Sequence, residues 1–221
     1  MLDNTASSGA AKKPYHRGDL PEALLAAAEN VLVRDGIAGV GLRAIAREAE
    51  VSHTAPKHHF GDLANLLSEL AARGYQRLGE ALRDATRDAT DYEARRRGVA
   101  KTYVRFACDH PQLFGLMFRN EIISLQNANL LAAIRSSLLG MAEAVSERAI
   151  STESYASEGI SKEEAMRITV AWAYLHGLAT LLVDKRLGGL AKFSGFESAR
   201  MLVEQILDQV TITMTIGEKE A

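Results

Sequence analysis

The chain has 221 residues, a formal net charge of −2, and a composition of 47% hydrophobic and 24% charged residues. These values are those of an ordinary soluble protein that can bury a sizeable core. Its single cysteine, Cys108, excludes an intramolecular disulfide framework and is compatible with a reducing cytoplasm. No apolar run approaches the length of a bilayer span, and the N-terminus lacks a hydrophobic signal core. We therefore expect a cytoplasmic protein without a membrane partner.

Residues 1–14 are rich in Ser, Ala, Gly and Lys and are expected to form a disordered leader. A helix-start signal follows, in which Asp19 is a candidate N-cap, Pro21 lies in the first turn and Glu22 completes a capping box. We predict a first helix over residues 23–35, ended by Gly36. Its inward stripe consists of apolar residues at helical spacing: Leu24, Ala27, Ala28, Val31 and Leu32.

Two short helices joined by a tight turn are predicted next. The first carries apolar residues at helical spacing, namely Leu42, Ile45, Ala46 and Ala49. The chain turns at Glu50, and Val51 re-enters the core. Either Ser52 or Thr54 could cap the second helix, because a hydroxyl oxygen accepts from the free backbone N–H groups at a helix start. Pro56 suits the first turn of that helix, where a missing N–H matters least.

The second short helix carries polar residues that packing does not explain: His53, Thr54, Lys57 and His58. Two helices joined by a few residues, the second polar and outward, form the helix-turn-helix arrangement that lays a recognition helix in the major groove of DNA. The net charge argues mildly against nucleic acid. The placement of the basic residues favours it, because they cluster at the leader and the two short helices: Lys12, Lys13, Arg17, Arg43 and Lys57.

Residues 15–67 resemble the DNA-binding domain of TetR-type transcriptional regulators. The matching pieces are Tyr15 to Leu20, the first predicted helix ending at Gly36, Leu42 to Ala46, Val51 to His53, and His59-Phe60 before a long helix. A shorter segment, Trp172 to Gly177, resembles the Trp-His-Gly stretch of one subtype of TetR C-terminal domain. The resemblance implies an all-helical homodimer whose C-terminal domain senses a small molecule.

The predicted DNA contacts are polar residues of the leader and the helix-turn-helix: Arg17, Arg43, Ser52, His53, Thr54, Lys57, His58 and His59. The chain departs from the family pattern at two points. Lys57 stands where an aromatic residue is usual, and Leu63 stands where a phosphate-binding lysine is common. We expect DNA-backbone contacts at these points to be redistributed or lost.

Almost all of the remaining chain has helical periodicity, so the predicted fold class is all-α. We expect a helix-turn-helix DNA-binding domain at residues 15–62 and an effector-binding and dimerisation domain, a helical bundle, at residues 63–221. Asp62 begins a long helix that runs to about Asp88. Further helices are predicted over residues 92–109, 112–118, 125–150, 161–187 and 196–215. Breaks are expected near Pro111, in the polar segment 151–159, and at Gly188-Gly189.

Aromatic and methionine side chains are concentrated in these C-terminal helices. Such residues usually fill a core, but a bundle rich in large apolar groups with occasional polar handles can also enclose a pocket. Trp172 and His176 are four residues apart and share one helix face, which suits a pocket wall. The predicted ligand-binding residues are Tyr103, Phe106, Phe114, Met117, Phe118, Trp172 and His176.

Metal and catalytic sites are weaker interpretations. His53, His58 and His59 are close in sequence, but adjacent histidines on a helix point about 100° apart and no Cys or carboxylate completes a site at ligand spacing. The run Cys108 to His110 has no identifiable third member or oxyanion hole. We expect no enzyme activity, no metal and no cofactor.

The sequence therefore predicts a TetR-like repressor that binds a palindromic DNA operator as a homodimer and is released by a small hydrophobic or amphipathic effector. Two alternatives stay open: a DNA-binding regulator without an effector, and an enzyme or carrier on a helical bundle. Dimerisation is expected through residues 161–187 and 196–215, which are apolar on more than one face. The long helix from Asp62 is the expected link between the effector and the DNA.

Overall fold

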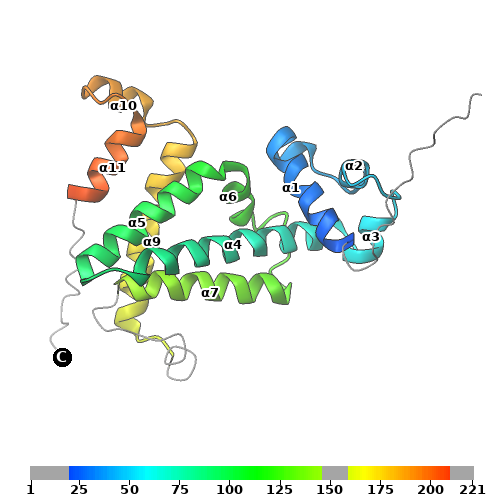
Figure 1. The fold of residues 1–221 in the computed structure, drawn as a ribbon, viewed down its shortest axis with the longest axis horizontal. Coiled ribbons are helices and arrows are strands. Elements are labelled where there is room, and N and C mark those ends of the chain that lie inside the picture. The colour runs from blue at the N-terminus through cyan, green and yellow to red at the C-terminus, as the bar shows by residue number, and fades with distance from the viewer. Residues whose placement is uncertain (1–19, 146–158, 210–221) are drawn as a thin grey trace, which may run out of the picture.

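The computed structural model describes residues 20–145 and 159–209, and every regular element within those two segments is a helix (Figure 1). The predicted all-α fold class is therefore confirmed. The helices are α1 (Leu20–Gly39), α2 (Leu42–Glu48), α3 (Ala55–Phe60), α4 (Leu63–Arg87), α5 (Tyr92–Asp109), α6 (Pro111–Met117), α7 (Ala128–Val145), α9 (Lys162–Val183), α10 (Gly188–Phe193) and α11 (Ala199–Gln209).

Helices α1, α2 and α3 gather at one end of the molecule around the start of α4 (Figure 1). The stripe predicted on α1 is buried, and Ile45 of α2 packs with it, while Ala46 of α2 is also buried. Glu50 makes the turn after α2 with a φ of 54°, and the backbone N–H of Val51 then donates to the carbonyl of Ala46 over 3.0 Å. Gly36 breaks the helical backbone with a φ of 68°, but helical turns resume beyond it as far as Gly39.

Helix α4 runs from this end through the rest of the bundle (Figure 1). It begins as predicted at Asp62, whose Oδ1 accepts from the backbone N–H of Asn65 over 2.8 Å. Its buried stripe extends from Leu66 to Leu82 and packs against α5, α6 and α7. Two ion pairs also fasten α4 to α1. Arg77 binds both carboxylate oxygens of Glu29 at 2.5 and 2.8 Å, and Arg73 pairs with Glu22.

Helix α6 lies between the first helix and the bundle, in contact with α1, α4 and α5. The buried hydroxyl of Tyr75 on α4 donates to the backbone carbonyl of Met117 over 2.9 Å. Beside it, Gly74 lets the two helices approach so closely that a Cβ at this position would lie 2.7 Å from Sδ of Met117. Glycine on α4 and a large side chain on α6 therefore fix the distance between these helices.

Several predicted helix boundaries were wrong for local reasons. Helix α11 begins at Ala199 rather than at residue 196, and Oγ of Ser198 accepts from the N–H of Met201 over 3.2 Å. Helix α7 begins at Ala128 rather than at residue 125, because Oδ1 of Asn127 accepts from the N–H of Leu130 over 2.8 Å and caps the helix. Helix α9 ends at Val183 rather than at residue 187. Lys185, two residues after this end, adopts a φ of 58°, which is not helical. The expected break at Gly188-Gly189 was also wrong, since these glycines start α10. The predicted leader with Arg17, the N-cap Asp19, and residues 146–150 and 210–215 lie outside the described residues.

Helix α9 is long and apolar enough to cross a membrane by length and composition, although no such run was expected from the sequence. It starts with a complete capping box between Ser161 and Glu164, and it packs against α5 and α7. Only Ile168, Leu175 and Ala179 are buried on it. Much of its apolar surface is therefore uncovered in a single chain.

Candidate functional site

The outward surface of α2 and α3 is entirely polar. Arg43 on α2 and Lys57, His58 and His59 on α3 are exposed. The opposite side of α3 is apolar, with Pro56 buried and Phe60 packed against the core. This division of faces holds α3 against α4 and leaves its polar face open to solvent, as a recognition helix requires.

The turn that precedes α3 is polar as well, and Ser52, His53 and Thr54 are all exposed. The predicted side-chain cap on α3 was wrong, because neither hydroxyl bonds to the helix start. Instead, Oγ of Ser52 accepts from the backbone N–H of Thr54 over 3.3 Å, and the two hydroxyl groups lie 2.8 Å apart. Both hydroxyls therefore hold the turn in shape.

Arg47 is a further candidate contact that was not predicted from the sequence. It lies four residues after Arg43, is exposed, and so shares one face of α2 with it. The next residue, Glu48, is engaged elsewhere, since its carboxylate binds Arg34 of α1 over 2.6 Å. The (i, i+4) spacing of two arginines on a predicted helix was the available signal.

Five of the seven predicted ligand-binding residues come together in one cluster, formed by Tyr103, Phe114, Phe118, Trp172 and His176. We call these residues the aromatic cluster. The His176 ring lies 4.4 Å from that of Phe118 and 5.4 Å from that of Phe114, measured between centroids. Tyr103 is 1% exposed, while Phe118, Trp172 and His176 are half-buried. The cluster therefore extends from the core toward the surface.

The other two predicted ligand-binding residues lie apart from the cluster's ring contacts. Phe106 is buried, but its ring packs on that of His110 with centroids 5.0 Å apart. Met117 is buried against Gly74. Tyr75, in contrast, joins the cluster through an edge contact with Phe118 at 5.8 Å. Tyr75 was not among the predicted ligand-binding residues.

Hydrogen bonds link three members of the aromatic cluster. Nε1 of Trp172 donates to the hydroxyl oxygen of Tyr103 over 3.3 Å, and that hydroxyl lies 3.1 Å from Nδ1 of His176. Burial raises the pKa of Tyr103, so its proton is retained. Burial also lowers the pKa of His176, which favours a neutral imidazole.

Comparison with known proteins decides the family. A model of the bacterial regulatory proteins of the tetR family matches residues 24–70, and a model of the tetracyclin repressor-like C-terminal domain matches residues 96–206. The chain belongs to the TetR family. It is thus a DNA-binding transcriptional regulator, and α2 and α3 form its helix-turn-helix. No curated protein sequence matches this TetR-family chain.

Solved structures share the fold over nearly the whole chain. A protein of unknown function from Rhodococcus sp. RHA1 is 36% identical, with a TM-score of 0.67 over 89% of this chain and 96% of its own. The TetR family transcriptional regulator PfmR from Thermus thermophilus is 16% identical, with a TM-score of 0.56 over 84% of this chain and 94% of its own. The fatty acid degradation regulator FadR from Bacillus halodurans is 17% identical, with a TM-score of 0.56 over 92% of this chain and 100% of its own.

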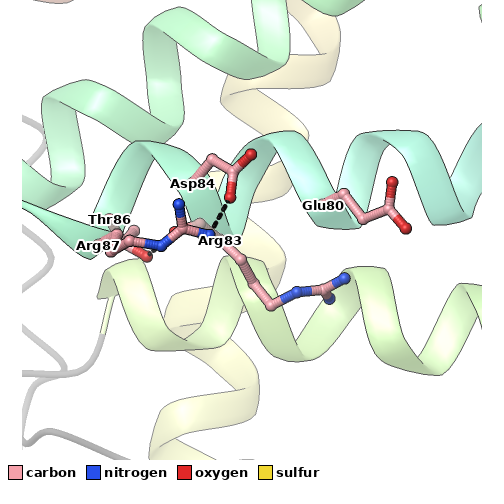
Figure 2. Close-up of a pocket in the computed structure, with 5 residues that line it drawn as sticks. All are labelled: Glu80, Arg83, Asp84, Thr86 and Arg87. Atoms are coloured by element: carbon pink, nitrogen blue, oxygen red, sulfur yellow. Dashed lines mark hydrogen bonds and ion pairs between the residues drawn. The ribbon is translucent and has the colours of Figure 1, made fainter.

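A concave region lies on the surface of α4 and is lined by Glu80, Arg83, Asp84, Thr86 and Arg87 (Figure 2). The charges are largely engaged with neighbouring groups, since Arg87 binds Asp84 over 2.5 Å and Arg83 donates to Oγ of Ser136 over 3.3 Å. The lining is polar and open to solvent, which does not suit an apolar effector.

The neutral state of His176 leads to a prediction about pH. Because the folded pKa lies below the ordinary 6.5, the unfolded chain takes up this proton first as the pH falls. The contribution of neutral His176 to the free energy of unfolding is thus complete above about pH 6.5 and declines at lower pH. Denaturant unfolding between pH 7.5 and 5.5 should show a weaker pH dependence in His176→Gln than in the native protein. Equal profiles for the native protein and His176→Gln would contradict the prediction.

Proposed function

We propose that this TetR-family regulator is a cytoplasmic repressor that binds a palindromic operator as a homodimer and is released by a small apolar or amphipathic effector. The observation that carries the DNA-binding part is the two-sided α3, with Pro56 and Phe60 packed inward and Lys57, His58 and His59 exposed. Two such helices, related by two-fold symmetry, would read half-sites about one helical turn apart.

The dimer is supported by an apolar stripe on α9. Met166, Val170, Ala173, Gly177 and Leu181 recur at helical spacing. Met166, Val170 and Leu181 are exposed by 45%, 44% and 38%, Ala173 is also exposed, and Gly177 is half-buried. The exposed apolar residues of α10 and α11 extend the surface, with Phe193 exposed by 95%. A helix that is apolar beyond its buried stripe belongs to an interface, and small residues at the centre allow close approach of a second copy. We name these five residues of α9 the α9 stripe.

The DNA contacts give a direct test. Arg43→Ala and Lys57→Ala should each weaken binding to an operator selected from random duplexes, without unfolding the protein. A lost base contact costs about 1–3 kcal/mol and relaxes specificity at one position, whereas a lost phosphate contact weakens all sequences alike and lowers the salt dependence. Fluorescence anisotropy of the labelled duplex at several salt concentrations measures both effects.

A matched control is Lys192→Ala. Lys192 is an exposed lysine on α10, at the opposite end of the molecule from α3 (Figure 1). Its replacement should leave operator affinity unchanged. If no sequence motif is enriched from random duplexes, or if Lys192→Ala weakens binding as much as Lys57→Ala, the assignment of the DNA surface is wrong.

The effector site is proposed at the aromatic cluster, because large apolar rings and polar groups converge there on a partly exposed surface. An effector bound among these rings would act on α6 through Phe114, and α6 contacts both α1 and α4. Trp172 is the only tryptophan, so its emission reports directly on ligands at this place. A compound that raises the melting temperature should also shift Trp172 emission and reduce operator binding by a coupling energy of about 1–3 kcal/mol. A compound that releases the operator without changing the emission would place the site elsewhere.

A regulator without an effector is the second candidate. It is favoured by the closeness of the rings, since Phe114 and Phe118 are 5.0 Å apart and His176 fills the space beside them. In that case these side chains only fill the core. A metabolite library that produces no specific thermal stabilisation would support this alternative.

A further inference from the structure

The hydrogen bonds of the aromatic cluster fix where the proton of His176 lies. The indole Nε1–H of Trp172 can only donate, so the oxygen of Tyr103 accepts from it over 3.3 Å. The Tyr103 hydroxyl keeps its proton and lies 3.1 Å from Nδ1 of His176. If the hydroxyl oxygen accepted from both Trp172 and His176, its own proton would have no acceptor in the cluster, so in a neutral imidazole we infer that Nδ1 accepts and the ring proton lies on Nε2.

The Nε2–H group of His176 has no hydrogen-bond partner within residues 20–145 and 159–209. Its ring is flanked by Phe118 at 4.4 Å and Phe114 at 5.4 Å, neither of which offers a strong acceptor. The ring is half-buried and Nε2 is not fully buried, so water can reach this donor and the acceptor of a ligand would take the place of that water.

In the part of the chain that the structure describes, no charged side chain is hydrogen-bonded to His176. Within the described segments, the hydrogen bonds of the cluster join only Trp172, Tyr103 and His176. Burial of the ring lowers the pKa of His176. A carboxylate placed here would lose its hydration without meeting a cation, which is unfavourable.

We propose that the effector is an uncharged molecule with an apolar body and a carbonyl-type oxygen, and that this oxygen accepts from Nε2–H of His176. The inference rests on the proposed effector site. It adds the chemical class of the ligand and names His176 as the residue that selects it.

The proton position can be tested without any ligand. Long-range ¹H–¹⁵N spectra of the native protein at pH 7.5 should show the His176 ring protonated at Nε2 only, with the resonances assigned by their absence in His176→Gln. Tyr103→Phe should convert that ring to a mixture of tautomers, since its fixed donor is gone. A ring protonated at Nδ1 in the native protein would overturn the inference and leave the effector site itself untouched.

Ligand class is tested with three probes of similar size: acetophenone, ethylbenzene and benzoate. Titrations followed by protein NMR should give acetophenone an affinity roughly three- to tenfold above that of ethylbenzene, as one net hydrogen bond provides, with benzoate weakest. His176→Leu should remove the preference for acetophenone, and Tyr103→Phe should reduce it. The matched control His110→Gln should retain it, because His110 packs on Phe106 outside the cluster.

The possible outcomes separate the two proposals. Equal binding of acetophenone and ethylbenzene to the native protein, with shifts at Trp172, would overturn the acceptor inference and keep the effector site. Tightest binding of benzoate would overturn the uncharged class in the same way. If none of the three probes shifts resonances of the aromatic cluster, the effector site is wrong and this inference falls with it.

Discussion

Ala173→Glu is expected to convert this regulator into a monomer and to remove specific operator binding. Ala173 is exposed at the middle of the α9 stripe, between Val170 and Gly177. In the proposed dimer, glutamate here would bury a carboxylate in an apolar surface, beside the same residue of the second copy. Each monomer would then present one recognition helix, and affinity should fall at least about 10³-fold, to the non-specific level.

Sedimentation velocity at micromolar concentration and duplex binding measure the two consequences separately. Ala26→Glu is the control for oligomeric state, because Ala26 is also an exposed helical alanine but lies on α1. It should remain dimeric. A native protein that sediments as a monomer, or a dimeric Ala173→Glu, would count against the α9 stripe as the interface.

Gly74→Ala is expected to destabilise the protein relative to Gly79→Ala on the same helix. Alanine is favoured over glycine inside a helix by about 1 kcal/mol at both positions. At position 74, however, the added Cβ would lie 2.7 Å from Sδ and 2.9 Å from Cγ of the buried Met117. At position 79 the nearest atom is the flexible Nη1 of Arg83, at 3.4 Å.

The gain in helix propensity is the same in Gly74→Ala and Gly79→Ala. The difference between their free energies of unfolding therefore isolates the effect of the contact between α4 and α6. Overpacking of this kind costs roughly 1–3 kcal/mol. Chemical denaturation of the two variants gives the value. Equal stabilities would show that α6 can shift away from α4 without loss.

The N-terminal half of the fold was predictable because its signals are local. Asp62 caps α4, Glu50 makes the turn, and Gly36 breaks the first helix, as helix-terminus and turn chemistry require. The C-terminal boundaries were less predictable. Two consecutive glycines usually stop a helix, yet Gly188 and Gly189 begin α10, because the chain had already left α9 at Lys185. A positive φ at a lysine has no sequence signal.

The candidate sites differ in the same way. Exposed polar residues of α3 follow from helical spacing alone, so the DNA surface could be proposed from the sequence. The aromatic cluster depends on tertiary contacts, such as the bond between Tyr103 and His176 across 73 residues. The sequence indicated which side chains could line an effector site. It could not show that Phe106 packs on His110 outside the cluster, or that Tyr75 contacts Phe118 within it.

The two ion pairs between α4 and α1 affect where the recognition helix lies along the DNA. Arg73 and Arg77 bind Glu22 and Glu29, so the helix-turn-helix follows any tilt of α4. With 25 residues, α4 is roughly 37 Å long. If α4 rotated by about 5° about its C-terminal end, its N-terminal end would move by roughly 3 Å. This displacement is close to the rise of one base pair, about 3.4 Å. A small tilt of α4 is thus enough to put a recognition helix one base pair out of step.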